Sequence, residues 1–171
     1  SFVCPHFPLV APQEFYDLYD PDKIPVPKAR PDSGYERHPW VDGLANCQIY
    51  DRFFTDETRN IAQAAYMGMV SFLDDNIGKL LASLEEHGLA DNTRIVYTSD
   101  HGDNLGARGL WGKSNFYEEA GAVPFIMAGD GVPEGKVCNT AANLLDSYQT
   151  ILDCVGVDMN EEDKSLPGDS L

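Results

Sequence analysis

Residues 93–129, TRIVYTSDHGDNLGARGLWGKSNFYEEAGAVPFIMAG, decide the fold of this chain. They open with a short apolar, β-branched run that predicts a buried strand over residues 93–100. A second run of this kind, AVPFIMAG at residues 122–129, follows a glycine-rich loop. Asp100 and His101 therefore fall at the carboxyl end of the first strand, which is where α/β sheets place their ligands.

A long amphipathic helix is predicted before the first strand, over residues 56–87. Its apolar side chains recur at steps of three and four residues, which places them on one stripe of the helix. The stripe consists of Ile61, Ala65, Met69, Phe72, Leu73, Ile77, Leu80, Leu81 and Leu84. Thr55 or Asp56 is suited to cap the start, and Gly88 suits the left-handed position that ends such a helix.

Two further elements are predicted after the second strand: a weaker third strand over residues 136–140 and a helix over residues 146–155. Helix, strand, loop, strand and helix in this order are typical of an α/β sheet. Residues 1–50 are rich in proline, and that density forbids long helices. We expect an extended segment there, with a short helix around residues 12–19.

The charge of the chain excludes two classes of partner. Its 28 acidic side chains against 12 basic ones give a formal net charge of −16. Nucleic-acid binding needs clustered Lys and Arg, and an anionic membrane surface repels acidic proteins. No apolar run approaches the roughly 18 residues of a membrane span. We therefore expect neither a nucleic acid nor a membrane as partner, and the acidic surface favours solubility.

The ends of the sequence indicate a fragment of a longer protein. SFVCPHFPL begins as if within a strand, and KSLPGDSL stops where a loop has just begun. The cysteines, Cys4, Cys47, Cys138 and Cys154, show no CxxC or zinc-finger spacing. Scattered cysteines of this kind are usually reduced core residues, which favours the cytoplasm. The periplasm and secretion are the alternatives, because a leader would lie upstream of a fragment.

Three interpretations of the glycine-rich loop compete. A P-loop needs four residues between its first glycine and the GK pair, but Gly106 is followed by five before Gly112. Asp100 would also place a carboxylate where phosphate oxygens approach, so a P-loop is excluded. A solvated flexible loop and half of a metal site stay open. In the second case an Asp–His pair offers ligands to a divalent cation, and Lys113 neutralises an anion held by that cation.

The same region resembles the second signature region of the sulfatases, members of the alkaline-phosphatase-like superfamily. The family pattern is a strand ending in T-S-D-H or T-S-D-N, a G-x-x-G-x-x-G loop, a G-K pair, then Y-E and V-P. Residues 93–129 match nearly all of it. Three more segments resemble the family in the family's order. They are PHFPLVAPQEFYDLY (5–19), YMGMVSFLDDNIGKLLASLEEHGLADNT (66–93) and LLDSYQTILDCVGV (144–157), where Gln149 stands in place of the usual Pro.

The resemblance implies a fold and a division of the chain. The fold class would be α/β, as part of an alkaline-phosphatase-like mixed or parallel sheet flanked by helices. Residues 1–50 would form a Pro-rich extended segment over the active-site face. Residues 51–171 would be an incomplete portion of the single α/β sulfatase catalytic domain.

The resemblance also implies roles for individual residues. Asp100 and His101 would be two ligands of a divalent cation, with Ca, Mg and Mn all possible. Lys113 would contact the sulfate or phosphate oxygens and stabilise the leaving group, and His6 would face the same anion as a donor or general acid. Arg108 replaces a His common in the family, and an Arg there could read an acidic group of the substrate. A His as the last metal ligand occurs in branches that include choline-sulfatase-like and phosphonate monoester hydrolase-like enzymes.

Each of these residues also has a structural interpretation. His6 lies between two prolines and could pack a loop, and Lys113 could be an ordinary solvated lysine. Tyr117 and Glu118 are expected to fix the loop onto the following strand. Asp146 is expected to cap its helix rather than to bind metal.

The family nucleophile is absent from this chain. It is a formylglycine made from Cys or Ser in a C/S-x-P-S-R motif, and two further metal-binding Asp lie near the family's amino terminus. Neither motif occurs here, since Cys4 in CPHFP has no Pro two positions later and no Arg four positions later. We therefore expect a fragment, inactive alone, of a metal-dependent enzyme that hydrolyses a small-molecule sulfate ester. The alternatives are a phosphonate monoester or phosphodiester hydrolase of the same superfamily, and a non-catalytic binding or structural module. No expectation for the oligomeric state follows.

Overall fold

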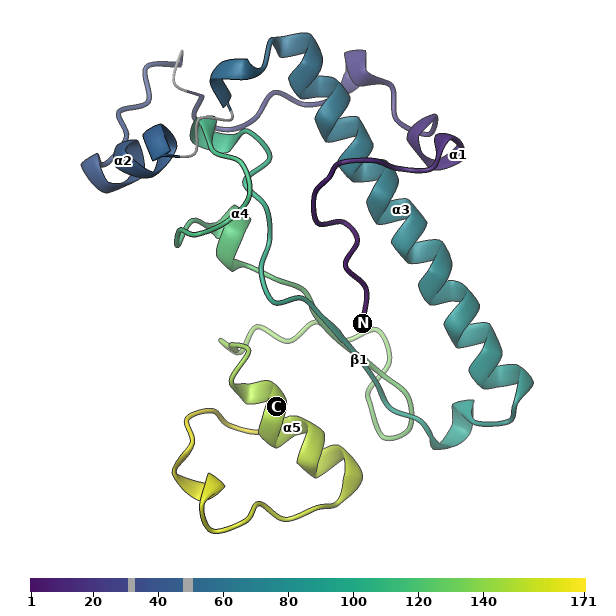
Figure 1. Cartoon of the computed structure of the whole chain (residues 1–171). Coiled ribbons are helices and arrows are strands. Elements are labelled where there is room, and N and C mark those ends of the chain that lie inside the picture. The colour runs from purple at the N-terminus through teal and green to yellow at the C-terminus, as the bar shows by residue number, and fades with distance from the viewer. Residues whose placement is uncertain (31–32, 48–50) are drawn as a thin grey trace. The chain divides into compact units, whose positions relative to one another are not determined.

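The computed structural model describes residues 1–30, 33–47 and 51–171, and it divides into two compact units (Figure 1). The first unit comprises Ser1–Ala90 and His101–Pro124, and the second comprises Asp91–Asp100 and Phe125–Leu171. Residues 31–32 and 48–50 of the predicted Pro-rich segment lie outside the described residues. The division of the chain at residue 50 stays a prediction.

The main element of the first unit is α3 (Asp56–Glu86). Its start is fixed by a reciprocal capping box, in which the hydroxyls of Thr55 and Thr58 each accept the backbone N–H of the other residue at 3.1 and 2.8 Å. The helix ends before Gly88, whose φ of +65° is the left-handed conformation that favours glycine. The predicted bounds and caps of this helix are confirmed.

The buried residues of α3 all lie between Arg59 and Leu73. The buried side chains and glycine of this helix are Arg59, Gln63, Ala64, Ala65, Gly68, Met69 and Leu73. The predicted stripe is therefore right for its middle members and wrong for Ile61 and Leu80, which are exposed. Periodicity marks the apolar face of a helix, but it does not tell how far along the helix another segment covers that face.

The amino-terminal segment packs against this part of α3. Within it, α1 (Gln13–Tyr16) is shorter than predicted and begins directly after Pro12. The ring of Phe15 meets Phe72 edge to face, with centroids 5.4 Å apart. The thiol of Cys4 donates to the carbonyl oxygen of Met69 at 3.2 Å. These contacts hold the segment that carries His6 against a rigid helix.

Several short elements complete the first unit. They are η1 (Pro21–Lys23), α2 (Pro39–Cys47), η3 (Asp51–Phe53), η5 (Ala107–Gly109) and α4 (Glu118–Gly121). The last two lie in the glycine-rich loop. Across the parts of the chain that the structure describes, no helix is long and apolar enough to cross a membrane.

The second unit contains a pair of strands, β1 (Ile95–Thr98) and β2 (Phe125–Ala128). They pair antiparallel, with Ile95 opposite Ala128 and Thr98 opposite Phe125. Both strands occur where the sequence predicts them, but they are shorter, and none of their residues is buried. Residues 136–140 form no strand: the sheet of the described residues consists of β1 and β2, and Val137 is 87% exposed.

The helix α5 (Asp146–Val155) has the predicted bounds, but Asp146 does not cap it. Leu145 stands at the N-cap position without a side-chain bond, and the carboxylate of Asp146 instead accepts the N–H groups of Asn143 and Asp169 at 2.7 and 3.0 Å. These two hydrogen bonds stabilise the ionised form and lower the pKa of Asp146. Asp146 therefore fastens the carboxyl-terminal loop, which also contains η6 (Asp163–Ser165), to the start of α5.

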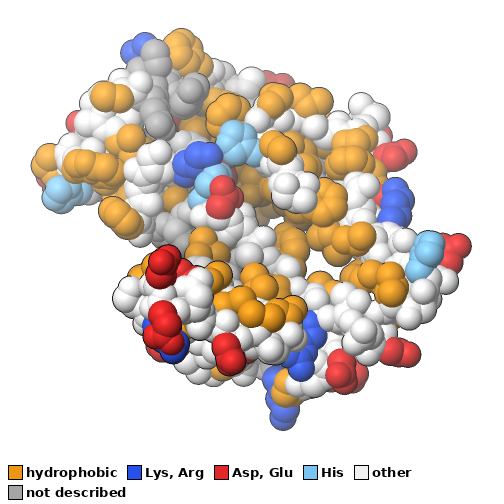
Figure 2. All heavy atoms as spheres, turned by 60° about the horizontal axis from the view of Figure 1, so that its bottom comes forward, with side chains coloured by type: hydrophobic (Ala, Val, Ile, Leu, Met, Phe, Trp, Pro, Cys, Tyr) orange, Lys and Arg blue, Asp and Glu red, His pale blue; other side chains and the backbone are white. Residues whose placement is uncertain are grey.

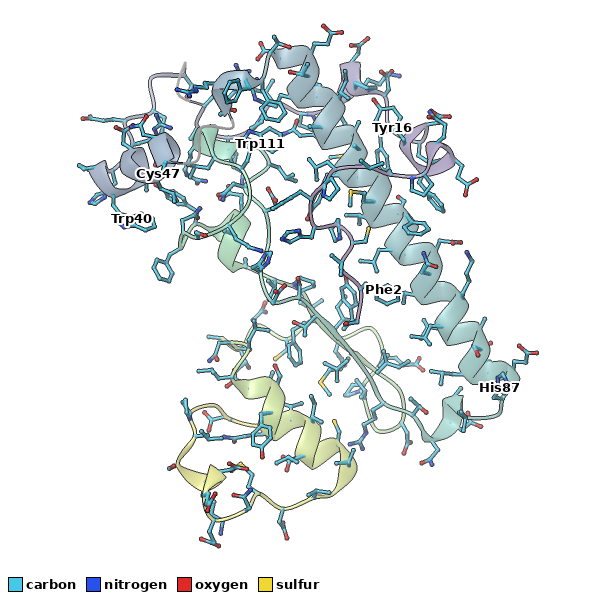
Figure 3. All side chains as sticks on the ribbon, viewed as in Figure 1. Phe2, Tyr16, Trp40, Cys47, His87 and Trp111 are labelled. Atoms are coloured by element: carbon cyan, nitrogen blue, oxygen red, sulfur yellow. The ribbon has the colours of Figure 1, made fainter. Side chains whose placement is uncertain are left out.

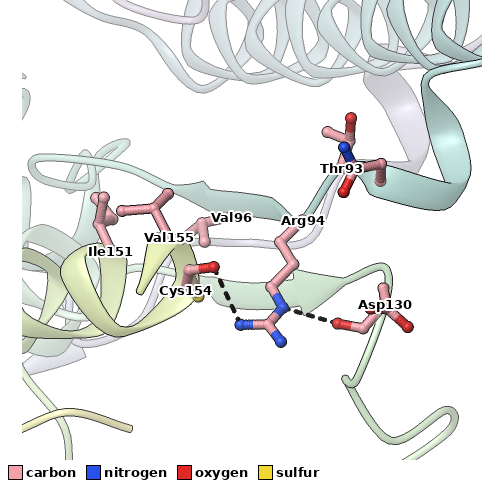
Figure 4. Close-up of a pocket in the computed structure, with 8 residues that line it drawn as sticks. Thr93, Arg94, Val96, Asp130, Ile151, Cys154 and Val155 are labelled. Carbon is pink, nitrogen blue, oxygen red and sulfur yellow. Dashed lines mark hydrogen bonds between the residues drawn. The ribbon is translucent and has the colours of Figure 1, made fainter. Parts of the chain in front are cut away.

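Arg94 connects the strands to α5 within the second unit (Figure 4). Its guanidinium donates to the carbonyl oxygens of Asp130 at 2.7 Å and Cys154 at 3.3 Å. The apolar side chains of Val96 and Val155 line a pocket of about 260 Å³ beside these bonds. The short element η4 (Ala90–Asn92) precedes this arginine. Arg94 therefore acts as a structural link between the strand pair and the helix.

Apolar side chains remain widely exposed, as the orange patches of Figure 2 show. Phe116 in the glycine-rich loop is fully exposed, and Val137 and Val155 are also exposed. Two of the four cysteines, Cys47 and Cys138, are exposed as well, so the expectation that the cysteines are core residues is wrong for these two.

Two glycines of α3 provide a matched pair of substitutions that tests the packing of the amino-terminal segment. A Cβ on Gly68 would lie 3.0 Å from the Cβ of Ala11 and 3.1 Å from the carbonyl oxygen of Phe15, whereas a Cβ on Gly78 would meet nothing within 4 Å. We expect Gly68→Ala to destabilise the protein by about 1–3 kcal/mol. Gly78→Ala should stabilise it by about 0.5–1 kcal/mol, because alanine is the better helix former. Thermal unfolding of the two variants measures both effects, and equal shifts would contradict this packing.

Candidate functional site

Three sequence-predicted residues meet in the first unit. The Nζ atom of Lys113 lies 2.9 Å from Nε2 of His6 and 2.7 Å from Nε2 of His101. The centroids of the two imidazole rings are 6.0 Å apart. His6 comes from the amino-terminal segment, and the other two residues come from opposite ends of the glycine-rich loop. The structure thus brings a cation and two imidazoles together from segments that are distant in sequence.

Both imidazoles are oriented by a backbone carbonyl. Nδ1 of His6 lies 3.0 Å from the carbonyl oxygen of Phe7, and Nδ1 of His101 lies 2.9 Å from that of Gly102. A carbonyl oxygen only accepts, so each Nδ1 carries a hydrogen and each neutral ring presents Nε2 as an acceptor. The ammonium of Lys113 donates to both acceptors. A carbonyl that holds Nδ1–H and leaves Nε2 available is also the arrangement of a metal-ligating histidine, so His101 fits the predicted role.

The glycine-rich loop returns on itself through Asp103 and Asn104. One oxygen, Oδ1 of Asp103, accepts the N–H groups of Leu105 at 2.9 Å and Gly112 at 3.0 Å. The backbone N–H and the side-chain amide of Asn104, which is only 2% exposed, both donate to the carbonyl oxygen of Gly112. These bonds place Lys113 beside His101. Our interpretation of the sequence missed both roles, although Asp and Asn are the residues that most often form such side-chain turns.

The loop is anchored to α3 and to the segment just before it by two side chains that the sequence did not single out, Gln63 and Trp111. The amide of Gln63 donates to the carbonyl oxygen of Leu105 at 2.6 Å. The indole N–H of Trp111, which is labelled in Figure 3, donates to Asp51 at 3.2 Å. The same indole stacks on Phe54 with centroids 4.3 Å apart. A lone Gln on a helix and a lone Trp in a loop give no signal of a shared anchor until the fold is known.

Three side-chain-bearing residues of the loop adopt left-handed backbone conformations. They are Leu105 with φ +46°, Arg108 with φ +56° and Ser114 with φ +77°. Such conformations are uncommon outside glycine and cost roughly 1–3 kcal/mol each, so they persist only where surrounding contacts impose them.

Arg108 is held by protein groups. Its guanidinium forms an ion pair with Glu119 at 2.7 Å and lies 3.9 Å from the centroid of the Tyr117 ring. The hydroxyl of Tyr117 is 2.8 Å from that of Tyr35, and this hydrogen bond, together with burial, raises the pKa of Tyr117. The structure gives Arg108 and Tyr117 a part in fixing the loop. Binding of an acidic group of the substrate by Arg108 stays a prediction.

Asp100 follows β1 as the sequence predicts, and its side chain is exposed. It belongs to the second unit, whereas His101 belongs to the first. Among the residues that the structure describes, no group of three or more His, Cys, Asp or Glu side chains is placed to hold a metal ion. The pairing of Asp100 with His101 as metal ligands therefore stays a prediction, and this chain offers two candidate ligands rather than a complete set.

Comparison with known proteins decides the family. The family model described as Sulfatase matches residues 1–157. This chain belongs to the sulfatase family. A choline-sulfatase from Rhizobium meliloti (strain 1021) is 35% identical over 162 residues, which are 94% of this chain and 31% of that protein. A multifunctional alkaline phosphatase superfamily protein from Trinickia caryophylli is 30% identical over 185 residues, covering 100% of this chain and 35% of that protein.

Solved structures confirm the α/β, alkaline-phosphatase-like fold of this sulfatase-family chain. A phosphonate monoester hydrolase from Silicibacter pomeroyi superposes with a TM-score of 0.79 at 34% identity, covering 98% of this chain and 34% of that one. The phosphonate monoester hydrolase of Agrobacterium radiobacter, at 23% identity, shows the same fold with a TM-score of 0.81. The chain spans about a third of the length of the curated relatives it matches.

The ion pair of Arg108 predicts a pH dependence of stability. Burial of Glu119 favours its neutral form, but a bond from its own backbone N–H and the pair with Arg108 outweigh burial and hold its pKa below the usual 4.5. The stabilisation is therefore complete above that value and is lost as the pH falls through the lowered pKa. We expect Glu119→Gln to destabilise the protein by roughly 1.5–3 kcal/mol at neutral pH and to match the wild type in strong acid.

Denaturant titrations of the full-length protein across this pH range measure the effect. Glu118→Gln is the matched control, because the neighbouring Glu118 is exposed and has no ion pair with Arg108. A loss of stability of the same size in both variants would show that the pair with Arg108 is not responsible.

Proposed function

We propose that the protein hydrolyses a small-molecule sulfate ester and that Lys113, His6 and His101 form the side of the active site that holds its anionic group. The observation that carries this proposal is the ammonium of Lys113, held within 2.9 Å of both Nε2 atoms. Membership of the sulfatase family and similarity to a choline-sulfatase support it. A non-catalytic module would have no need for a cation and two oriented imidazoles in one place.

In this proposal Lys113 binds the oxygens of the ester and stabilises the charge that develops on the leaving group. An ammonium has three donors, so Lys113 can turn from the imidazoles to the oxygens of a bound anion. His6 faces the same anion. Because its Nδ1–H is held by the carbonyl of Phe7, His6 donates a proton only when Nε2 is protonated as well.

Asp100 and His101 would hold a divalent cation, Ca, Mg or Mn. When bound, the cation supplies Lewis-acid stabilisation of negative charge on the ester oxygens. The same Nε2 of His101 that would bind the cation accepts from Lys113 in this structure. Lys113 must therefore leave that nitrogen when His101 acts as a ligand, and its donors then become available to the substrate.

The proposed nucleophile is a formylglycine that lies outside these residues. The printed sequence contains no C/S-x-P-S-R motif, and Cys4 does not fit it. The hydrated form of such a residue, a geminal diol, would attack the sulfur through one of its oxygens, and the bond between the sulfur and the alcohol oxygen would break while Lys113 and His6 stabilise the departing oxygen. The full-length sequence of the protein bears directly on this step, and the absence of that motif from it would contradict the proposed mechanism.

A second candidate function is hydrolysis of a phosphonate monoester or a phosphodiester. The specific observation in its favour is the similarity to the phosphonate monoester hydrolase from Silicibacter pomeroyi over 98% of this chain. Sulfate monoesters, phosphonate monoesters and phosphodiesters all present a tetrahedral group with one negative charge. One ammonium and two neutral imidazoles suit each of them, so assays of the full-length protein with aryl sulfate and aryl phosphonate esters choose between the two functions.

Substitution of Lys113 tests the proposed site. We expect Lys113→Ala to lower kcat/KM for the preferred ester by about 10²–10³-fold, because a donor aimed at developing charge is removed. Lys79→Ala is the matched control, since Lys79 is exposed on α3 and pairs only with the nearby Asp75 among the contacts described. Steady-state kinetics and thermal unfolding should show a loss of turnover without a loss of stability. Wild-type rates in Lys113→Ala would contradict its assigned role.

Removal of metal tests the roles of Asp100 and His101. We expect a chelator to abolish turnover of the full-length protein and one of Ca, Mg or Mn to restore it. Asp100→Ala and His101→Ala should each weaken metal binding at least about tenfold, because each removes a ligand atom. Titration with metal, followed by calorimetry, measures this independently of activity. His87→Ala at the exposed end of α3 is the control and should bind metal like the wild type.

A further inference from the structure

We infer that an apolar pocket beside Lys113 binds the alcohol part of the ester as an uncharged aromatic or alkyl group. The pocket has a volume of about 380 Å³ and lies wholly within the first unit. The apolar side chains of Phe7, Leu9, Phe54 and Trp111 line it, together with Lys113. This assignment of a substrate class rests on the function proposed above and extends it.

The pocket adjoins the anion site at two residues, Lys113 and Phe7. Lys113 lines the pocket, and its ammonium contacts the two imidazoles. Phe7 also lines it and directly follows His6, whose ring lies 4.3 Å from the phenyl ring between centroids. A single molecule with an anionic head and an apolar body therefore reaches both places. Pockets of about 300–1,000 Å³ are of the size that binds small organic ligands.

Trp111 and Phe54 form an aromatic wall of the pocket, and contacts within the protein hold this wall in place. Trp111 stacks on Phe54 with an angle of 12° between the rings, and its indole N–H donates to Asp51. Asp51 is in turn paired with Arg59 at 3.3 Å. A preformed wall of this kind binds an apolar group without first being ordered. Because the indole N–H of Trp111 is bonded to Asp51, it is not available to a ligand.

The charges at the pocket favour an uncharged ligand group over a cationic one. Lys113 places a positive charge at one end of it. Of the described lining residues, only Asp103 carries a carboxylate, and its Oδ1 accepts two backbone N–H groups that close the loop. A quaternary ammonium group would be repelled by the ammonium of Lys113, and Asp103, whose Oδ1 accepts the two backbone N–H groups, is the one carboxylate among the described lining residues that could offset this repulsion.

Three sulfonates that share one head group test this inference without depending on turnover. The probes are methanesulfonate, benzenesulfonate and N,N,N-trimethyltaurine, titrated into the full-length protein by calorimetry. We expect benzenesulfonate to bind at least about tenfold more tightly than methanesulfonate, because burial of its ring in an apolar pocket is favourable. Equal affinities for these two would overturn the inference. Tighter binding of N,N,N-trimethyltaurine than of benzenesulfonate would overturn the choice of an uncharged group.

Substitutions within and outside the pocket locate the effect. Leu9→Ser and Phe54→Ala should each remove most of the preference for benzenesulfonate and leave the affinity for methanesulfonate within about twofold. Phe54 also supports Trp111, so Leu9→Ser provides a variant that does not disturb the stacked pair. Phe116→Ala is the matched control, because Phe116 is fully exposed and does not line the pocket. Loss of preference in Phe116→Ala alone would place the binding site elsewhere and overturn the inference.

Hydrolysis of phenyl sulfate, measured on the same samples, separates failure of the inference from failure of the proposed function. Ring-dependent binding without hydrolysis of any sulfate or phosphonate ester supports the pocket and contradicts the proposed function. Hydrolysis of phenyl sulfate with equal binding of benzenesulfonate and methanesulfonate supports the function and overturns the pocket.

Discussion

The arrangement of the site depends on one carboxylate oxygen. Oδ1 of Asp103 accepts the N–H groups of Leu105 and Gly112, and this joins two points of the loop that are seven residues apart in the sequence. The loop consequently returns to its own beginning, and Lys113 comes to lie beside His101. Hydrogen bonds from backbone N–H groups to a carboxylate are charge-assisted, so they hold the two points of the loop together strongly. The ammonium, the imidazole of His6 and the apolar pocket next to them are all positioned relative to this closed loop.

A single lysine between two neutral imidazoles also indicates which anions suit the site. Lys113 contributes one positive charge, which suits the single negative charge of a monoanionic ester, and a divalent cation held by Asp100 and His101 would add to this charge in the proposed function. Sulfate esters and phosphonate monoesters are both monoanions. The likeness of this chain to enzymes named for either substrate is therefore in keeping with the charge of Lys113 and its partners. Discrimination between the two then depends on the reactivity of the nucleophile and on groups that contact the remainder of the substrate.

Among the local signals of the sequence, those at the two ends of α3 were reliable, whereas the expected cap at Asp146 was wrong. Thr55 and Gly88 defined both ends of α3, because capping involves only neighbouring residues. The resemblance to the sulfatases brought His6, His101 and Lys113 into one hypothesis, and the structure places them in contact. The sequence did not predict the ion pair of Arg108 with Glu119, because it depends on the turn of the loop. It also did not predict the pocket around Trp111, because the lining residues come from segments that are distant in sequence. The prediction of a strand at 136–140 was wrong, because β-branched side chains favour a strand but do not supply a partner strand.

The left-handed residues of the loop have a mechanical consequence. Leu105, Arg108 and Ser114 are each held in a conformation that a free chain would leave. Contacts with neighbouring groups support two of these residues: Gln63 on α3 holds Leu105, and Glu119 holds Arg108. Gln63 on α3 therefore contributes, through Leu105, to the shape of the loop that carries Lys113.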